Sequence, residues 1–197
     1  MVDRISDIFF LVDSGISQQQ FNLFRTELNK LINQLNIGAS NNRIGLAQYG
    51  QNIRVEFLLN AHQTKQETQA SVKRFRLRPP QPNEPRNLGR ALEYARTNFF
   101  TSDAGGRAEQ GFRQFLVVVS GQASSDSDRR IVVSEVRSIR KSGVTIVGMS
   151  AGAPMDSVRL LSDQDVFDSP RVTLLKDLFI TEKEDNITEG EKPFVII

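Results

Sequence analysis

Three short runs without a charged residue constrain this fold more than any other feature of the sequence. They cover residues 8–12, 115–119 and 144–147, and a segment with helical periodicity follows each one. A continuous apolar run indicates a strand buried on both faces, because a strand with one wet face alternates apolar and polar residues. Right-handed crossovers join such strands into a parallel sheet with helices on both sides. The sequence therefore predicts a doubly wound α/β fold.

The segments between these strands complete a mostly parallel, six-stranded sheet. Residues 43–49 and 53–59 predict two strands joined by a tight turn at 50–52, which adds one antiparallel edge strand. A small strand is expected at 165–167. Apolar spacings of three and four residues predict helices on both faces of the sheet. These helices are expected at 17–36, 64–74, about 88–98, from 131 to a stop at 143, 155–161 and 170–181.

Length and composition fit one domain followed by a short polar segment. The chain has 197 residues, of which 39% are hydrophobic and 24% charged, as in a soluble globular protein. Four prolines exclude regular structure from 78–85, and a glycine-rich loop covers 102–111. We expect the domain at 1–181 and a polar linker at 182–197. Asn186 begins an Asn-Ile-Thr glycosylation acceptor in that linker.

Several classes of protein are disfavoured by what the sequence lacks. It contains no cysteine, so a disulfide framework and a thiolate metal site are both excluded. No apolar run approaches the roughly 20 residues of a membrane span, so we expect no membrane insertion. A net charge of +2 is too small to indicate nucleic-acid binding.

One pattern offers a catalytic nucleophile. Residues 148–152, Gly-Met-Ser-Ala-Gly, fit the nucleophile elbow G-x-S-x-G directly after a predicted strand. An elbow serine needs a histidine that follows it in the chain, but the single histidine, His62, precedes Ser150 and lies beyond the hairpin. No glycine-rich phosphate-binding loop is present either. We expect neither an enzyme nor a cofactor, and a serine hydrolase using Ser150 is kept as an alternative.

Five sequence motifs, in their order along the chain, carry a family resemblance. They are Asp7–Asp13, Arg43–Tyr49, Asn87–Leu92, Phe115–Val119 and Arg140–Ile146. Together they resemble a von Willebrand factor A domain, a Rossmann-like fold, over about Ser6 to Thr181. Three further segments resemble the N-terminal A-domain array of the collagen VI alpha-3 chain: Ala91–Phe99, Ala104–Arg107 and Gln114–Val119.

This resemblance implies a place and a role. It implies a secreted, non-catalytic module of the extracellular matrix that supports microfibril assembly and cell or matrix adhesion. The partners implied are other matrix proteins and neighbouring A domains of the same chain.

The family also implies a divalent-cation site at the carboxyl ends of the strands, from which this sequence departs. Many members bind Mg²⁺ there through D-x-S-x-S, a Thr and an Asp, and a partner's acidic residue completes the ion's shell. Here Asp13 is kept, Ser14 and Ser17 lie in a loop that looks shortened, Arg86 takes the place of the Thr, and Gly121 that of the Asp.

We therefore expect no metal, because one carboxylate and one or two hydroxyls cannot replace the water shell of a dication. Two positions are open for Arg86: paired with Asp13, or pointing into solvent from the proline-rich loop. A metal-dependent adhesion domain that binds an acidic partner residue through Mg²⁺ is the alternative function.

A basic cluster gives a second partner prediction. Residues 72–77 resemble the heparin-binding pattern X-B-B-X-B-X, in which B is a basic residue. The cluster consists of Lys73, Arg74, Arg76 and the adjacent Arg78. Lysine and arginine side chains attract sulfate groups through charge and hydrogen bonds, so a heparin-like glycosaminoglycan is a candidate partner. A solvated helix end, with cations favoured by the helix dipole, is the other interpretation.

Overall fold

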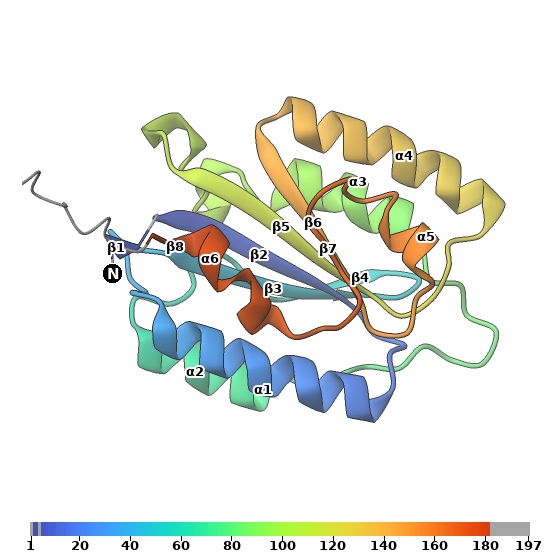
Figure 1. Cartoon of the computed structure of the whole chain (residues 1–197), viewed down its shortest axis with the longest axis horizontal. Coiled ribbons are helices and arrows are strands. Elements are labelled where there is room, and N and C mark those ends of the chain that lie inside the picture. Colours follow the sequence, from blue (N-terminus) through green and yellow to red (C-terminus); the bar gives the residue numbers. More distant parts are fainter. Residues whose placement is uncertain (1, 4, 182–197) are drawn as a thin grey trace, which may run out of the picture.

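A computed structural model gives the structure of residues 2–3 and 5–181 as three layers, with a sheet between two layers of helices (Figure 1). The six-stranded sheet has the order β4-β3-β2-β5-β6-β7, and β4 is its one antiparallel strand. The predicted sheet is thus confirmed. The strands are β2 (Ser6–Asp13), β3 (Arg43–Tyr49), β4 (Ile53–Phe57), β5 (Arg113–Ser120), β6 (Val144–Ser150) and β7 (Val166–Phe167).

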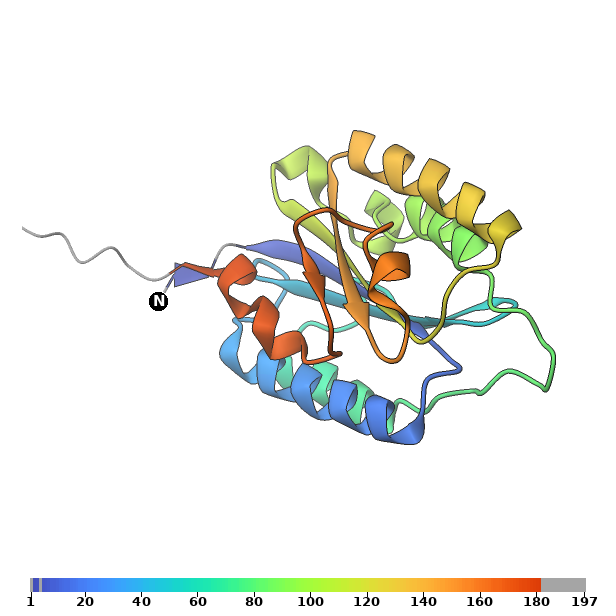
Figure 2. The same ribbon diagram turned by 45° about the vertical axis from the view of Figure 1, so that its right-hand side comes forward.

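Helices cover both faces of this sheet, as Figure 2 shows from a second direction. One face packs against α1 (Gln18–Gln34), α2 (Lys65–Arg74), the 3-10 turn η3 (Val172–Leu175) and α6 (Lys176–Phe179). The other face packs against α3 (Leu88–Asn98) and α4 (Asp126–Lys141), and α5 (Met155–Val158) lies beside β6. None of the helices in the described residues has the length and apolar character that crossing a membrane requires.

The two cores follow from the alternation of side chains along buried β2. Ile8, Phe10 and Val12 face the α1 side, whereas Phe9 and Leu11 face the α3 side. All five are 0% exposed, which explains why this strand reads as an unbroken apolar run.

Close packing on the α3 side requires a glycine. The ring of Phe9 stacks on that of Phe99, with ring centroids 3.8 Å apart. A Cβ on Gly45 of the adjacent β3 would lie 2.4 Å from the Phe9 ring. Any residue other than glycine at position 45 would therefore clash with the ring.

Several predicted boundaries are wrong. The helix expected at 170–181 is the 3-10 turn η3 followed by the short α6, and β8 (Ile180–Thr181) then pairs with β1 (Val2–Asp3). Helix α4 begins at Asp126, before the first apolar residue used to predict it, because the Ser125 side chain accepts from the N–H of Asp128 and caps it.

Three smaller differences concern lengths and loops. β4 ends at Phe57 and α5 at Val158, each shorter than predicted. The glycine-rich loop holds two 3-10 turns, η1 (Ser102–Ala104) and η2 (Ala108–Gln110). The predicted linker 182–197, with Asn186, lies outside the described residues.

Candidate functional site

The carboxyl ends of four parallel strands meet at one edge of the sheet, which we call the crest. It is formed by the ends of β2, β3, β5 and β6 with the loops that follow them, and Arg86 lies over it. The register aligns Asp13 with Tyr49 on one side, and Ser120 with Ser150 on the other. Open α/β sheets bind ligands at such an edge, so its side chains are the first candidates for function.

Asp13 is the acidic centre of the crest and is completely buried. Its Oδ1 accepts a hydrogen bond from the backbone N–H of Gly15 at 2.8 Å. Its Oδ2 accepts one from the backbone N–H of Gly121 at 2.9 Å. The carboxylate therefore ties the loop after β2 to the loop after β5.

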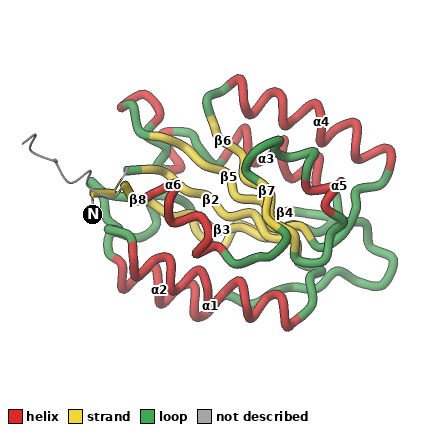
Figure 3. The backbone as a smooth tube through the Cα atoms, viewed as in Figure 1, coloured by secondary structure: helices red, strands yellow, loops and turns green. Residues whose placement is uncertain are grey.

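Arg86 completes the environment of this carboxylate. Its Nη1 donates to Asp13 Oδ1 at 3.2 Å and to Oδ2 at 3.1 Å. Of the two positions open for Arg86, the structure has the pair with Asp13. The segment that carries Arg86 is part of the long loop between α2 and α3 (Figure 3), and the N–H of Asn87 anchors it to the Gly50 carbonyl at 3.0 Å.

Two glycines make room for this arrangement. A Cβ on Gly15 would lie 2.4 Å from Nη1 of Arg86, so the guanidinium rests where any larger residue would project. A Cβ on Gly121 would lie 2.6 Å from Ile16 Cγ2 and 2.9 Å from Asp13 Oδ2. The family's Asp at position 121 would not fit without a shift of these neighbours.

Of the two candidate serines of the crest, Ser17 caps a helix and Ser14 is buried. The Ser17 hydroxyl accepts from the N–H of Gln20 at 3.2 Å and so caps α1. Ser14 is 4% exposed, and its own N–H donates to the Tyr49 carbonyl at 2.9 Å. Both serines therefore stabilise the structure of the loop after β2.

The phenol of Tyr49 lies in the same buried region. Burial raises its pKa well above the ordinary value, and the negative charge of Asp13 raises it further. Tyr49 is therefore a neutral hydrogen-bonding group here. Within the described residues, no three His, Asp or Glu side chains gather in a way that could hold a metal ion.

The geometry around Ser150 does not make a nucleophile. Its hydroxyl donates to the Ala153 carbonyl at 2.7 Å and accepts from the N–H of Gly152 at 3.2 Å, and the residue is 6% exposed. His62 follows β4, and three strands separate β4 from β6 in the sheet. Its ring packs against Phe57, with centroids 4.8 Å apart, and burial lowers its pKa. The structure does not bring Ser150 and His62 together.

The predicted basic cluster lies at the C-terminal end of α2 and in the chain after it, and all four of its side chains are exposed. Arg76 Nη1 donates to the carbonyls of Lys73 and Phe75, and Arg74 Nη2 to the Ser71 hydroxyl. Within the described residues, no carboxylate forms an ion pair with any of the four.

A fifth cation, which the sequence analysis missed, joins this cluster. Arg25 of α1 donates from Nη1 to the Phe75 carbonyl at 3.4 Å. Only the packing of α1 against α2 brings it there, since Arg25 lies 50 residues from Phe75 in the sequence.

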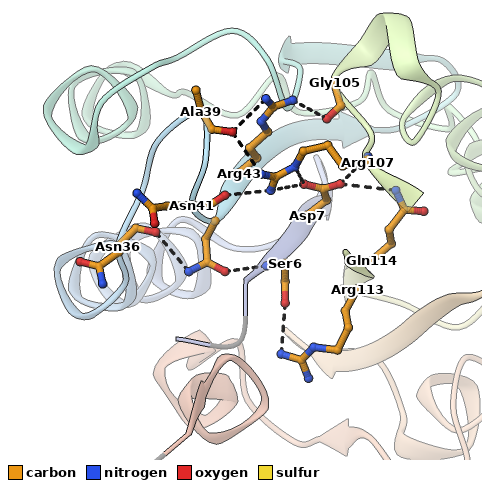
Figure 4. A network of polar contacts seen from close by, with 11 residues as sticks. Ser6, Asp7, Asn36, Ala39, Asn41, Arg43, Gly105, Arg107, Arg113 and Gln114 are labelled. Atoms are coloured by element: carbon orange, nitrogen blue, oxygen red, sulfur yellow. Dashed lines mark hydrogen bonds and ion pairs between the residues drawn. The ribbon is translucent and has the colours of Figure 1, made fainter. Parts of the chain in front are cut away.

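The opposite edge of the sheet holds a buried ion pair that the sequence analysis also missed (Figure 4). Arg107 donates to Asp7 from its backbone N at 2.7 Å, from Nε at 2.8 Å and from Nη2 at 2.6 Å. Its Nη1 and Nη2 also reach the carbonyls of Ala39 and Asn41. The pair joins β2, the loop before β3 and the turn before β5. A charged residue near the start of a buried strand was the available signal.

Comparisons with known proteins agree with this fold. The family model of the von Willebrand factor type A domain matches residues 7–179. The chain is 34% identical over 147 residues to the collagen alpha-4(VI) chain of Mus musculus. It is 31% identical over 146 residues to the collagen alpha-5(VI) chain and 30% over 156 residues to cochlin, both of Homo sapiens.

These alignments cover 73%, 73% and 78% of this chain, but only 6%, 5% and 26% of the relatives. The resemblance to collagen VI is thus confirmed for the alpha-4 and alpha-5 chains. The alpha-3 chain in particular stays a prediction.

Many solved structures share the fold, and two of them are described. One is proximal thread matrix protein 1 from the mussel byssus with a zinc-occupied MIDAS motif, at a TM-score of 0.72 and 16% identity, covering 90% of this chain and 48% of that one. The other is the manganese-loaded Plasmodium vivax TRAP protein, at a TM-score of 0.69 and 13% identity, covering 88% of this chain and 72% of that one.

Proposed function

Because this chain belongs to the von Willebrand factor type A domain family, we propose that it is a metal-independent, non-catalytic protein-interaction module of an extracellular-matrix collagen chain. It supports microfibril assembly and adhesion through contacts with other matrix proteins and neighbouring A domains. Its similarity to collagen VI chains and cochlin supports this setting. The pairing of Arg86 with Asp13 is the observation that carries the metal-independent mechanism.

The donor set at the crest supports this mechanism because it does not fit a dication. Both Asp13 oxygens already accept from a backbone N–H and from Arg86, and the Ser17 hydroxyl caps a helix. A cation at this position would have to displace the guanidinium, and until then it would meet like charge at short range. Such repulsion costs on the order of several kcal/mol at the effective dielectric near a protein surface.

The metal-dependent alternative rests on the fold neighbours whose titles name zinc and manganese. Their identity to this chain is 16% and 13%, so the likeness shows the fold alone. The hydrolase alternative lacks a base for the buried Ser150 hydroxyl. Treatment with a fluorophosphonate should leave Ser150 unlabelled.

A solid-phase assay tests the proposed function. Purified type VI collagen is immobilised, and binding of this domain is measured in EDTA and in excess Mg²⁺. We expect saturable binding with the same affinity in both buffers. Loss in EDTA with recovery in Mg²⁺ would overturn metal independence, and absence of saturable binding in both buffers would overturn the interaction with this matrix component.

The basic cluster on α2 supports a second function, the binding of a heparin-like glycosaminoglycan. Its support is that no carboxylate of the described residues pairs with the cluster, together with the additional charge of Arg25. On a heparin column, the domain should elute above physiological salt. Replacing Lys73, Arg74 and Arg76 by Gln should move elution to lower salt, and an unchanged elution would remove this function.

The boundary and the modification are further parts of the proposal. We place the domain at 1–181 and the linker at 182–197, in agreement with a family match that ends at residue 179. In a chain secreted from mammalian cells, Asn186 is proposed to carry an N-glycan. Mass spectrometry before and after glycosidase treatment tests this, and an unmodified Asn186 would contradict it.

A further inference from the structure

The outer layer formed by α3 and α4 carries most of the exposed large hydrophobic side chains of the described residues. Four large hydrophobic side chains of the described residues are exposed, and three of them belong to these two helices. Tyr94 of α3 is 40% exposed, and Ile131 and Val133 of α4 are 47% and 40% exposed. Single exposed hydrophobic residues are ordinary, but their concentration on one layer marks a candidate contact surface.

The face of α4 that exposes Val133 carries a row of cations, whereas Ile131 lies on the side of the helix next to Gly89 of α3. Arg130, Val133, Arg137 and Lys141 follow one another at spacings of three and four, so they share one side of the helix. All four are exposed. Val133 thus lies within a basic stripe, which we call the α4 stripe.

The positive charge of this stripe is only partly balanced by its own helix. Of the three acids on α4, Asp126 is exposed in the first turn, four residues before Arg130. Asp128 is buried and accepts from the N–H of Gly89, and Glu135 accepts from Nε of Arg96 at 2.8 Å. Within the described residues, no ion pair involves Arg130, Arg137 or Lys141. These three cations are therefore available to an external anion.

A groove beside the stripe combines charge with apolar surface. It has a volume of about 410 Å³ and is lined by Val133, Val136, Leu160, Arg137, Arg140 and Lys141. Arg140 has an exposed contact with Asp163 at 3.5 Å, which is weak because solvent screens it. An apolar side chain entering between Val133 and Leu160 would thus be surrounded by basic groups.

We propose that the α4 stripe and its groove dock an acidic segment of a protein partner, with one apolar side chain in the groove and carboxylates on Arg130, Arg137 and Lys141. This rests on the proposed interaction function and names the surface and the partner chemistry. Charge complementarity selects an acidic partner. The apolar lining selects a polypeptide over a sulfated polysaccharide, which has no hydrophobic side chain to bury there.

The length of the helix sets the size of the probe. α4 has 16 residues and is roughly 24 Å long, a distance that about seven extended residues span. The probe is a fluorescein-labelled peptide, acetyl-Glu-Glu-Leu-Glu-Glu-Leu-Glu-Glu, and binding is followed by fluorescence anisotropy. Two control peptides replace leucine by serine or glutamate by glutamine.

Two double variants with the same change of charge locate the binding. Arg137→Glu with Lys141→Glu should weaken binding of the probe by about tenfold or more, whereas Lys73→Glu with Arg74→Glu on α2 should change it less than about twofold. Val133→Ser should weaken binding several-fold, and both control peptides should bind more weakly than the probe. Circular dichroism verifies that each variant is folded.

Three outcomes overturn the proposal. The first is equal loss of binding in the two double variants, which would indicate a non-specific effect of net charge. The second is no saturable binding of the probe to the wild-type domain. The third is binding of a heparin oligosaccharide that depends on Arg137 and Lys141 while the peptide does not bind. If type VI collagen still binds the domain in these cases, the docking surface fails and the proposed function stands.

Discussion

A single nitrogen of Arg86, Nη1, donates to both carboxylate oxygens of Asp13, at 3.2 Å and 3.1 Å, across 73 residues of sequence. Asp13 is completely buried, and the Arg86 side chain is 19% exposed. A positive side chain of the protein thus neutralises the acidic group at the crest. It also fastens the proline-rich segment to the first long strand, so the crest is held together by an internal ion pair.

Removing Arg86 should destabilise the domain, because it leaves the buried Asp13 carboxylate without its positive partner. We expect Arg86→Ala to lower the free energy of unfolding by about 2 to 4 kcal/mol, somewhat below the usual range for a fully buried pair since solvent reaches the arginine. Urea denaturation measures the change. The control is Arg90→Ala, which removes an exposed arginine and should change stability by about 0.5 kcal/mol at most. Equal effects of the two substitutions would contradict this role of Arg86.

Gly15 and Arg86 should be energetically coupled, because a Cβ on Gly15 would lie 2.4 Å from Nη1 of the arginine. Gly15→Ala must push the guanidinium away from Asp13, and we expect a loss of about 1 to 3 kcal/mol. In an Arg86→Ala background these contacts are gone, so the same substitution should cost less. A double-mutant cycle measures this coupling, expected at about 1 kcal/mol or more. Additive effects would place the clash elsewhere.

Much of the fold could be predicted, because burial and periodicity are local properties of the sequence. The run at 8–12 predicts a doubly covered strand, and the structure buries those five residues completely. By contrast, β1 and β8 have two residues each, and no period can be recognised in so short a segment. Their pairing depends on the fold bringing the two segments together.

The sequence could predict which residues form the candidate site but not which contacts they make. The family pattern placed Asp13, Arg86 and Gly121 together at the crest, yet the sequence left the direction of the Arg86 side chain open. Arg25 and Arg107 were missed for the same physical reason. Their partners, Phe75 and Asp7, lie 50 and 100 residues away, and only tertiary packing determines such contacts.

Magnesium should not stabilise the domain if the Arg86 guanidinium occupies the cation's position. A ligand at a hundred times its dissociation constant stabilises a folded protein by about 2.7 kcal/mol, which a thermal melt detects readily. We expect the melting temperature to be the same in EDTA and in excess Mg²⁺ or Mn²⁺. A rise with either ion that disappears in Asp13→Asn would show a working metal site and refute the ion-pair mechanism.

Breaking the buried pair of Asp7 and Arg107 should cost more stability than breaking the pair at the crest. Arg107 is 3% exposed and Asp7 is 0% exposed, so Arg107→Ala leaves a carboxylate with little access to water. We expect a loss of about 3 to 5 kcal/mol in urea denaturation.

Arg107→Lys should recover only part of that loss, because an ammonium group cannot reproduce the contacts that Nε and Nη2 make together with Asp7. Arg43→Ala is the matched control. Arg43 donates to the carbonyls of Ala39 and Gly105, and its removal should cost about 1 kcal/mol. Full rescue by lysine would show that charge alone matters at this position.

His62 should make the domain less stable in mild acid. Burial lowers the pKa of its imidazole below the ordinary 6.5, an effect that the nearby Glu67 carboxylate opposes and Arg74 reinforces. Its Nε2 is buried and has no hydrogen-bond partner within the described residues. Well above pH 6.5 the ring is neutral in both states. As the pH falls below that value, the unfolded chain takes up the proton first, and the free energy of unfolding decreases.

The single histidine of the chain makes this prediction simple to test. Proton NMR should give a lower titration midpoint for the ring in the folded domain than in urea. Between pH 7.5 and 5, wild-type stability should fall more steeply than that of His62→Gln, which removes the titrating ring and leaves every carboxylate in place. A folded midpoint at or above the unfolded one would show that Glu67 outweighs burial, and the slope in acid would then have to come from the carboxylates.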